Sequence, residues 1–192
     1  LVETGARVFL DLKFHDIPDQ VQGACRAAAR LGVGLMTVHA AGGPAMLAAA
    51  AQGAREGSIE AGTKPSRVLA VTVLTSLDGG DLSAVGVSRP LPEQVLALAR
   101  LTAAAGCAGV VASPQELALL RDALPRPFGI LTPGIRPRGA DAGDQKRVTT
   151  PADAVRGGAD WLVVGRPIKD AADRGAAVAA ILEEMADAEE VG

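Results

Sequence analysis

Three charged side chains that could take part in acid–base or electrostatic catalysis lie close together near the start of the chain. Asp11 and Lys13 alternate with apolar residues in the run Val8-Phe9-Leu10-Asp11-Leu12-Lys13-Phe14. This alternation predicts a β-strand, and the strand period of two places Asp11 and Lys13 on one face. The other face would carry Val8, Leu10 and Leu12. We therefore expect a carboxylate and an ammonium that point the same way.

A second carboxylate, Asp16, follows where this strand should end. Pro18 comes two residues later and is suited to the first turn of a helix. A structural alternative is an ion pair between Asp11 and Lys13, with Asp16 acting only as a helix cap. Burial of a charged pair is often no better for stability than apolar packing, so the strand has little structural reason to carry one. The pattern favours a functional charge cluster at the carboxyl end of a strand.

Composition narrows the class of protein. The 192 residues are 48% hydrophobic and 21% charged, with a net charge of -3, which is typical of one soluble globular domain. The charge argues against a nucleic-acid partner, and no apolar run is long enough to cross a membrane. Cys25 and Cys107 lack the spacing of metal ligands and are expected to be buried thiols of a cytoplasmic protein. With only two histidines, no metal site is predicted.

The elements that would position the charged cluster follow a repeated strand–helix pattern, which predicts a parallel sheet covered by helices. Six strands are expected, near 7–12, 35–40, 68–74, 109–112, 128–131 and 161–164. Helices are expected near 18–31, 43–56, 92–105, 114–123, 151–157 and 171–188.

Six such units fit either an open doubly wound sheet or part of a closed (β/α)₈ TIM barrel. No G-x-G-x-x-G turn follows an early strand, so the barrel is favoured. A complete barrel has eight units and about 250 residues. The chain also begins without methionine almost directly before a strand. We therefore expect residues 1–192 to be a single barrel domain that lacks its first two βα units.

Two downstream segments suggest phosphate binding. Gly165-Arg166 follows the last predicted strand, where barrels often hold a phosphate with backbone amides and an arginine. The polar loop 138–147 contains Asp144-Gln145-Lys146-Arg147, which suits a lid over a phosphate. The alternatives are a surface arginine paired with carboxylates and a solvated loop.

Two further sets of polar residues are ambiguous. Thr75 and Ser76 end the third strand and could bind a planar heterocycle, although such a pair often caps the next helix. His15 and His39 could line the site, but local backbone contacts would explain each of them, and neither is assigned a catalytic role.

Taken together, the motifs resemble those of the orotidine 5'-phosphate decarboxylase family over nearly the whole chain and in the family's order. They are Asp-Leu-Lys-Phe-His-Asp-Ile-Pro at 11–18, Thr-Val-His-Ala-Ala-Gly-Gly at 37–43, Thr-Val-Leu-Thr-Ser at 72–76, Thr-Pro-Gly-Ile-Arg-Pro at 132–137, Asp-Gln-Lys-Arg at 144–147 and Val-Val-Gly-Arg-Pro-Ile at 163–168.

The resemblance implies decarboxylation of orotidine 5'-phosphate to UMP in pyrimidine biosynthesis, with no cofactor. It implies that Lys13 protonates C6 of the pyrimidine and that Asp11 and Asp16 complete a charge array, with Asp16 reaching the neighbouring subunit's site in a homodimer. The implied substrate-binding residues are Ile17, Gln20, Thr75, Ser76, Arg136, Gln145, Gly165 and Arg166.

The chain departs from the family pattern in two ways. A further lysine and a first-strand aspartate of the family belong to the units expected to be absent, so this piece alone is expected to be inactive. Asp19-Gln20 replaces the usual Asn-Thr, whose threonine contacts the ribose, and Gln20 could substitute with a longer amide.

Two other functions stay open. A 3-keto-gulonate-6-phosphate decarboxylase or hexulose-phosphate synthase shares Asp-x-Lys-x-x-Asp but uses Mg²⁺, and it has no need of the Thr-Ser pair or the Asp-Gln-Lys-Arg lid. The chain could instead be a non-catalytic module that binds a phosphate ligand or assembles with other chains.

Overall fold

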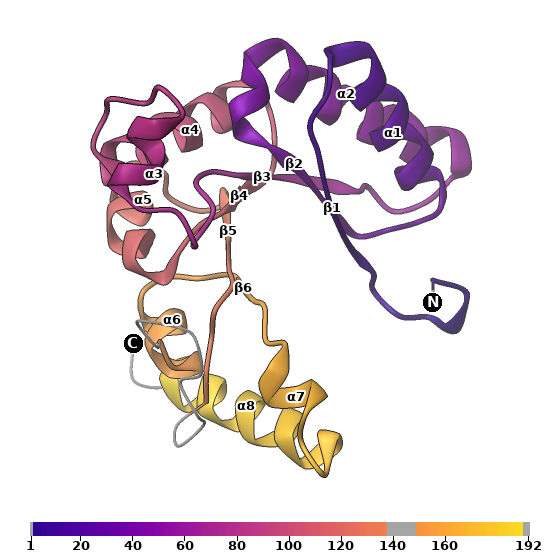
Figure 1. Cartoon of the computed structure of the whole chain (residues 1–192). Coiled ribbons are helices and arrows are strands. Elements are labelled where there is room, and N and C mark those ends of the chain that lie inside the picture. Colours follow the sequence, from indigo (N-terminus) through magenta and orange to yellow (C-terminus); the bar gives the residue numbers. More distant parts are fainter. Residues whose placement is uncertain (1, 138–148, 190–192) are drawn as a thin grey trace.

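In the computed structural model, which describes residues 2–137 and 149–189, six parallel strands form one curled sheet (Figure 1). The strands are β1 Phe9–Phe14, β2 Leu35–His39, β3 Arg67–Val71, β4 Gly109–Val111, β5 Gly129–Thr132 and β6 Trp161–Leu162. They lie side by side in the order of the chain. A doubly wound sheet reverses its order at a switch point, so this sequential order is that of a barrel segment. The predicted α/β barrel architecture is confirmed.

The helices lie along the outer side of this curved sheet (Figure 1). The α-helices are α1 Pro18–Arg30, α2 Gly43–Ala61, α3 Gly79–Ala84, α4 Leu91–Ala104, α5 Leu117–Ala123, α6 Pro151–Arg156, α7 Arg166–Lys169 and α8 Arg174–Glu189. Short 3₁₀ turns are η1 Val2–Thr4, η2 Ala40–Gly42 and η3 Pro114–Glu116. The sequence did not predict α3 or α7, which are too short to show a clear apolar period, and α2 continues to Ala61 instead of ending near 56. None of the helices in the described ranges is both long and apolar enough to span a membrane.

Close backbone contact holds α1 against α2. A Cβ atom added to Gly53 would lie 2.2 Å from the carbonyl oxygen of Gln22, and one added to Gly57 would lie 2.2 Å from that of Arg26. Only glycine permits helices to approach so closely, so these two positions set the distance between α1 and α2. Cys25 and Cys107 belong to the buried apolar cluster that α1 and α2 form with the first strands, and both are free thiols. Burial raises the pKa of each thiol to about 12. The prediction of buried cysteines is confirmed.

Trp161 packs on the inner face of the sheet, near the amino ends of the strands. A Cβ atom on Gly129 would lie 2.3 Å from the Trp161 ring, so the indole occupies the space that this glycine leaves. The Arg67 guanidinium lies 6.0 Å from the centre of the same ring, within the range of a cation–π contact. Trp161 and Arg67 therefore contact each other at the amino ends of the strands, away from the pocket described below at their carboxyl ends.

Strand β1 differs from its predicted form. It ends at Phe14 and not near Leu12, and its register with β2 shifts between Leu10 and Phe14. Lys13 has a φ of 52°, in the left-handed region that non-glycine residues rarely adopt. Leu12, which alternates with Asp11 and Lys13, is 59% exposed.

Candidate active site

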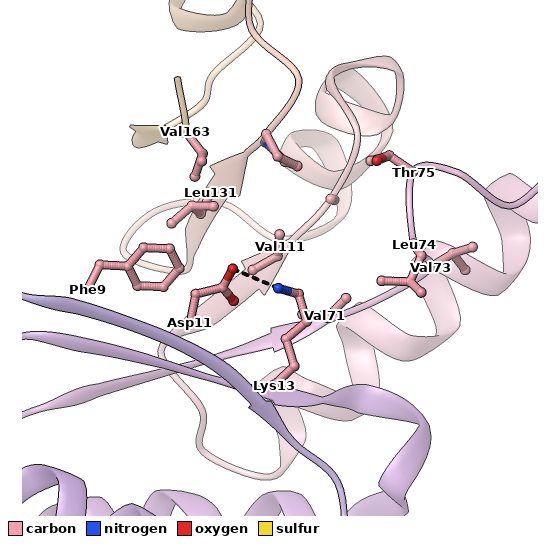
Figure 2. A pocket seen from close by; sticks show the side chains of 12 residues that line it. Phe9, Asp11, Lys13, Val71, Val73, Leu74, Thr75, Val111, Leu131 and Val163 are labelled. Carbon is pink, nitrogen blue, oxygen red and sulfur yellow. Dashed lines mark hydrogen bonds and ion pairs between the residues drawn. The ribbon is translucent and has the colours of Figure 1, made fainter. Parts of the chain in front are cut away.

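A pocket lies at the carboxyl ends of the strands and contains the predicted charge pair (Figure 2). Its volume is about 190 Å³. Asp11 and Lys13 point into it from β1, and the lysine Nζ donates to Asp11 Oδ2 at 2.7 Å. Thr75 lies on the opposite side, in the segment after β3. The strand period therefore placed both charged side chains correctly.

Apolar side chains make up most of the pocket wall. They are Phe9, Val71, Val73, Leu74, Val111, Ala112, Leu131, Pro133 and Val163. Pocket residues of one segment are often two positions apart. Examples are Phe9 and Asp11, Val71 and Val73, and Leu131 and Pro133. None of these apolar residues was predicted to belong to the site, although their alternation near strand ends was a usable signal. The charged pair itself stays partly open to solvent, with 37% of the Lys13 side chain and 43% of the Asp11 side chain exposed.

Both oxygens of the Asp11 carboxylate have donors. Lys13 occupies Oδ2, and the hydroxyl of Thr37 on β2 donates to Oδ1 at 2.8 Å. Thr37 is fully buried and was not singled out from the sequence. Because the lysine and the hydroxyl bind opposite oxygens, the carboxylate plane is held in one orientation toward the pocket.

His15 and His39 lie beside this pair without lining the pocket. Their ring centroids are 5.3 Å apart. Burial lowers the pKa of His39. The positive charges of His15 and Lys13 lower this pKa further, and the negative charge of Asp11 raises it. His39 is therefore held neutral at a pH where an ordinary histidine begins to take up a proton.

The lowered pKa of His39 predicts a pH dependence of stability. The unfolded chain binds a proton near the ordinary value of about 6.5, above the pKa in the folded state. Stability from this residue is therefore complete above about pH 6.5 and is lost as the pH falls toward the folded-state pKa. We expect the urea concentration at which half of the protein is unfolded to decrease when the pH is lowered from about 7.5 to about 5.5. A smaller fall in His39→Asn would support this account, and an identical fall in that variant would contradict it.

The second predicted carboxylate lies outside the pocket of its own chain. Asp16 is exposed, and its Oδ1 accepts the Ile17 backbone N–H at 2.6 Å. The N-cap of α1 is Ile17, which makes no side-chain cap, while Pro18 occupies the first turn as predicted. Ile17 is 63% exposed and Gln20 is also exposed. None of Asp16, Ile17 and Gln20 lines the pocket.

Of the Thr-Ser pair, only Thr75 lines the pocket, and Ser76 is exposed beside it. Neither caps the next helix, because Asp78 is the N-cap of α3 and forms a reciprocal capping box with Asp81. The alternative explanation of the pair as a helix cap is therefore wrong.

The described residues that were predicted to bind the phosphate do not line the pocket, unlike Asp11 and Lys13. Gly165 and Arg166 are exposed at the start of α7, just beyond Val163 of the pocket wall. Arg136 is 6% exposed and donates from Nη1 to the Ile135 carbonyl at 3.0 Å. Gln145 and the predicted lid 138–147 lie outside the described residues. In the part of the chain that is described, no group of three or more His, Cys, Asp or Glu side chains could hold a metal ion.

Comparison with known proteins identifies the family of this chain. Residues 1–181 match the family described as orotidine 5'-phosphate decarboxylase / HUMPS. The chain belongs to this family. It is 54% identical over 184 residues to the orotidine 5'-phosphate decarboxylase of Moorella thermoacetica, covering 95% of this chain and 73% of that protein. It is 55% identical over 178 residues to the Anaeromyxobacter sp. (strain K) protein of the same name, covering 92% and 74%.

Solved structures of the family support the fold. The crystal structure of orotidine 5'-phosphate decarboxylase from Lactobacillus acidophilus superposes with a TM-score of 0.86 at 39% identity, covering 96% of this chain and 77% of that one. The Pyrococcus horikoshii enzyme gives 0.71 at 26% identity, with 96% and 76% covered. The resemblance drawn from the motifs is confirmed.

Proposed function

We propose that this family member decarboxylates orotidine 5'-phosphate to UMP and CO₂ without a metal or organic cofactor. The observation that carries the proposal is the Asp11–Lys13 pair inside an apolar pocket that Thr75 also lines. The names of the Moorella and Anaeromyxobacter relatives, at 54% and 55% identity, point to the same substrate.

The proposed reaction uses the two charges of β1 at the carbon that loses CO₂. The bond from C6 of the pyrimidine to its carboxylate breaks, and the electron pair stays on C6. The Lys13 ammonium stabilises this developing negative charge and then protonates C6, after which solvent restores the lysine proton. Asp11 lies next to the lysine and would repel the substrate carboxylate before CO₂ leaves.

A second subunit would complete this site. We propose that Asp16, Ile17 and Gln20 act in the neighbouring subunit of a homodimer, since all three are exposed and none lines the pocket of its own chain. Leu12 and Ile17, 59% and 63% exposed, would supply apolar contact area at such an interface.

The 5'-phosphate would lie beside Val163, where Gly165 is the N-cap of α7 and Arg166 its first residue. We propose that Ser76 joins Thr75 at the pyrimidine, and that Arg136 and Gln145 belong to the phosphate end of the site. Binding energy from the phosphate can be expressed at the distant reacting carbon.

We also propose that two further βα units before β1 are needed for turnover. β1 and β6 stand at the two ends of the strand order, and the chain covers 77% of the superposed Lactobacillus structure. The test is to compare the 192-residue chain with the same chain carrying two N-terminal βα units from the Moorella relative, called the extended chain below. Equal turnover by both forms would contradict this part of the proposal.

The deciding experiment follows the ultraviolet absorbance of orotidine 5'-phosphate with each form of the chain, with and without a chelator. Loss of the orotate band in both conditions supports the proposed function. Loss that the chelator abolishes favours a metal-dependent sugar-phosphate type of site, which is the second candidate because the matching family also includes HUMPS proteins. UMP binding by a folded extended chain without any turnover would favour a non-catalytic binding module.

We further propose that the protein is cytoplasmic. Cys25 and Cys107 are free thiols, as is usual in a reducing compartment. Targeting of a fluorescent fusion of the chain to a membrane or to an extracytoplasmic space would contradict this assignment.

A further inference from the structure

The backbone of Lys13 cannot take part in the regular ladder of the sheet. Its φ is 52°, and it lies inside the register shift between Leu10 and Phe14, where the regular pairing with β2 is interrupted. The N–H instead donates to the hydroxyl oxygen of Thr37 on β2 at 3.0 Å. The unusual backbone that aims the lysine into the pocket is therefore held by a side chain of the neighbouring strand.

The same hydroxyl also determines the position of Asp11. An amide N–H can only donate, so the Thr37 oxygen accepts from Lys13 and its single proton goes to Asp11 Oδ1, 2.8 Å away. An ionised carboxylate can only accept, which fits this direction. The Lys13 Nζ then donates to Asp11 Oδ2 at 2.7 Å and closes a ring of three interactions.

From this ring we infer that Thr37 is a positioning residue for the decarboxylation, acting through Asp11 and Lys13 without contacting the substrate. It is fully buried and absent from the pocket wall. This inference rests on the proposed function. A hydroxyl that accepts from one member of the charge pair and donates to the other fixes both in one geometry, and a small misplacement of reacting groups can cost about 100-fold in rate.

A purely structural threonine would behave differently from a positioning one. If Thr37 only filled space between β2 and β1, valine would replace it, because the two side chains have nearly the same shape. If the hydroxyl positions the charge pair, valine would disturb the site, whereas serine would keep both hydrogen bonds and lose only a methyl group.

The test compares Thr37→Val and Thr37→Ser in the extended chain. We expect Thr37→Val to lower kcat by about 10-fold or more, with KM and the Kd for UMP within about 3-fold of the parent. We expect Thr37→Ser to keep kcat within about 3-fold of the parent value. An unchanged kcat in the valine variant, or a serine variant as slow as valine, would overturn the inference.

Thr102→Val is the matched control. Thr102 is also fully buried, and its hydroxyl donates to the Leu98 carbonyl within α4 at 2.8 Å, on a helix outside the sheet. This variant loses a buried threonine hydroxyl without touching the charge pair, so it should lose stability and keep kcat. A loss of kcat equal to that of Thr37→Val would show a general effect of stability and would overturn the inference.

A measurement that needs no turnover separates this inference from the proposed function. Hydrogen exchange at the Lys13 amide, followed by NMR in the ligand-free 192-residue chain, should be at least about 10-fold faster in Thr37→Val and near the parent rate in Thr37→Ser. If the parent does not decarboxylate orotidine 5'-phosphate, the proposed function fails while the exchange rates still test the hydrogen-bonded ring. Exchange that is equal in the parent and Thr37→Val would overturn the inference by itself.

Discussion

Lys13→Ala is expected to lower kcat for decarboxylation by about 10⁴-fold in the extended chain, while UMP still binds. Among the described residues that line the pocket, Lys13 carries the only cation, and in the proposed reaction it both stabilises the charge at C6 and supplies the proton. These two effects act in the transition state, so their loss should appear in kcat and leave ground-state binding of the product largely intact. The measurement is kcat from the orotate absorbance, together with UMP binding by calorimetry.

Lys64→Ala is the matched control for this variant. Lys64 is exposed in the segment before β3, at the end of the sheet opposite the pocket. The control variant loses the same type of side chain from the same protein and should keep both kcat and UMP binding unchanged. Turnover by Lys13→Ala at more than about a tenth of the parent rate would show that another group protonates C6, and the assignment of Lys13 would then be wrong.

Arg166→Ala is expected to weaken UMP binding by about 10-fold to 100-fold while the affinity for uridine stays the same. A hydrogen bond to a charged group contributes about 1.5–3 kcal/mol, and a guanidinium matches a phosphate with two parallel donors. Uridine lacks the phosphate, so it should not sense the loss of the arginine. Calorimetric titration of the parent and the variant with both ligands gives the four affinities needed.

Arg26→Ala serves as its control. Arg26 is an exposed arginine of α1 that pairs with Glu60 of α2 in the outer helical layer. Its removal changes the net charge by the same amount, so a general electrostatic effect would weaken UMP binding equally in both variants. That result, or an equal loss of uridine and UMP affinity in Arg166→Ala, would contradict a phosphate contact at Arg166.

Much of this protein could be predicted from the order of its residues. Alternation of apolar runs and helical segments predicted the six strands, and the strand period of two placed Asp11 and Lys13 together on one face. These are local properties, because side-chain direction in a strand depends only on position along it. The motifs around Thr75 and Arg166 were also readable locally, and they identified the family that the comparisons confirmed.

Contacts between distant segments were decided by the tertiary structure. Thr37 is 24 residues from Lys13 and 26 from Asp11, and no spacing rule links a mid-strand threonine to a carboxylate on another strand. The same holds for the exposure of Leu12 and of Asp16, which the alternation of residues along the strand does not predict. A parallel register brings together residues that local sequence cannot pair, because it depends on how whole strands and helices pack. The sequence by itself therefore determined which groups carry the proposed chemistry, whereas only the packing of β1 against β2 decided how those groups are held.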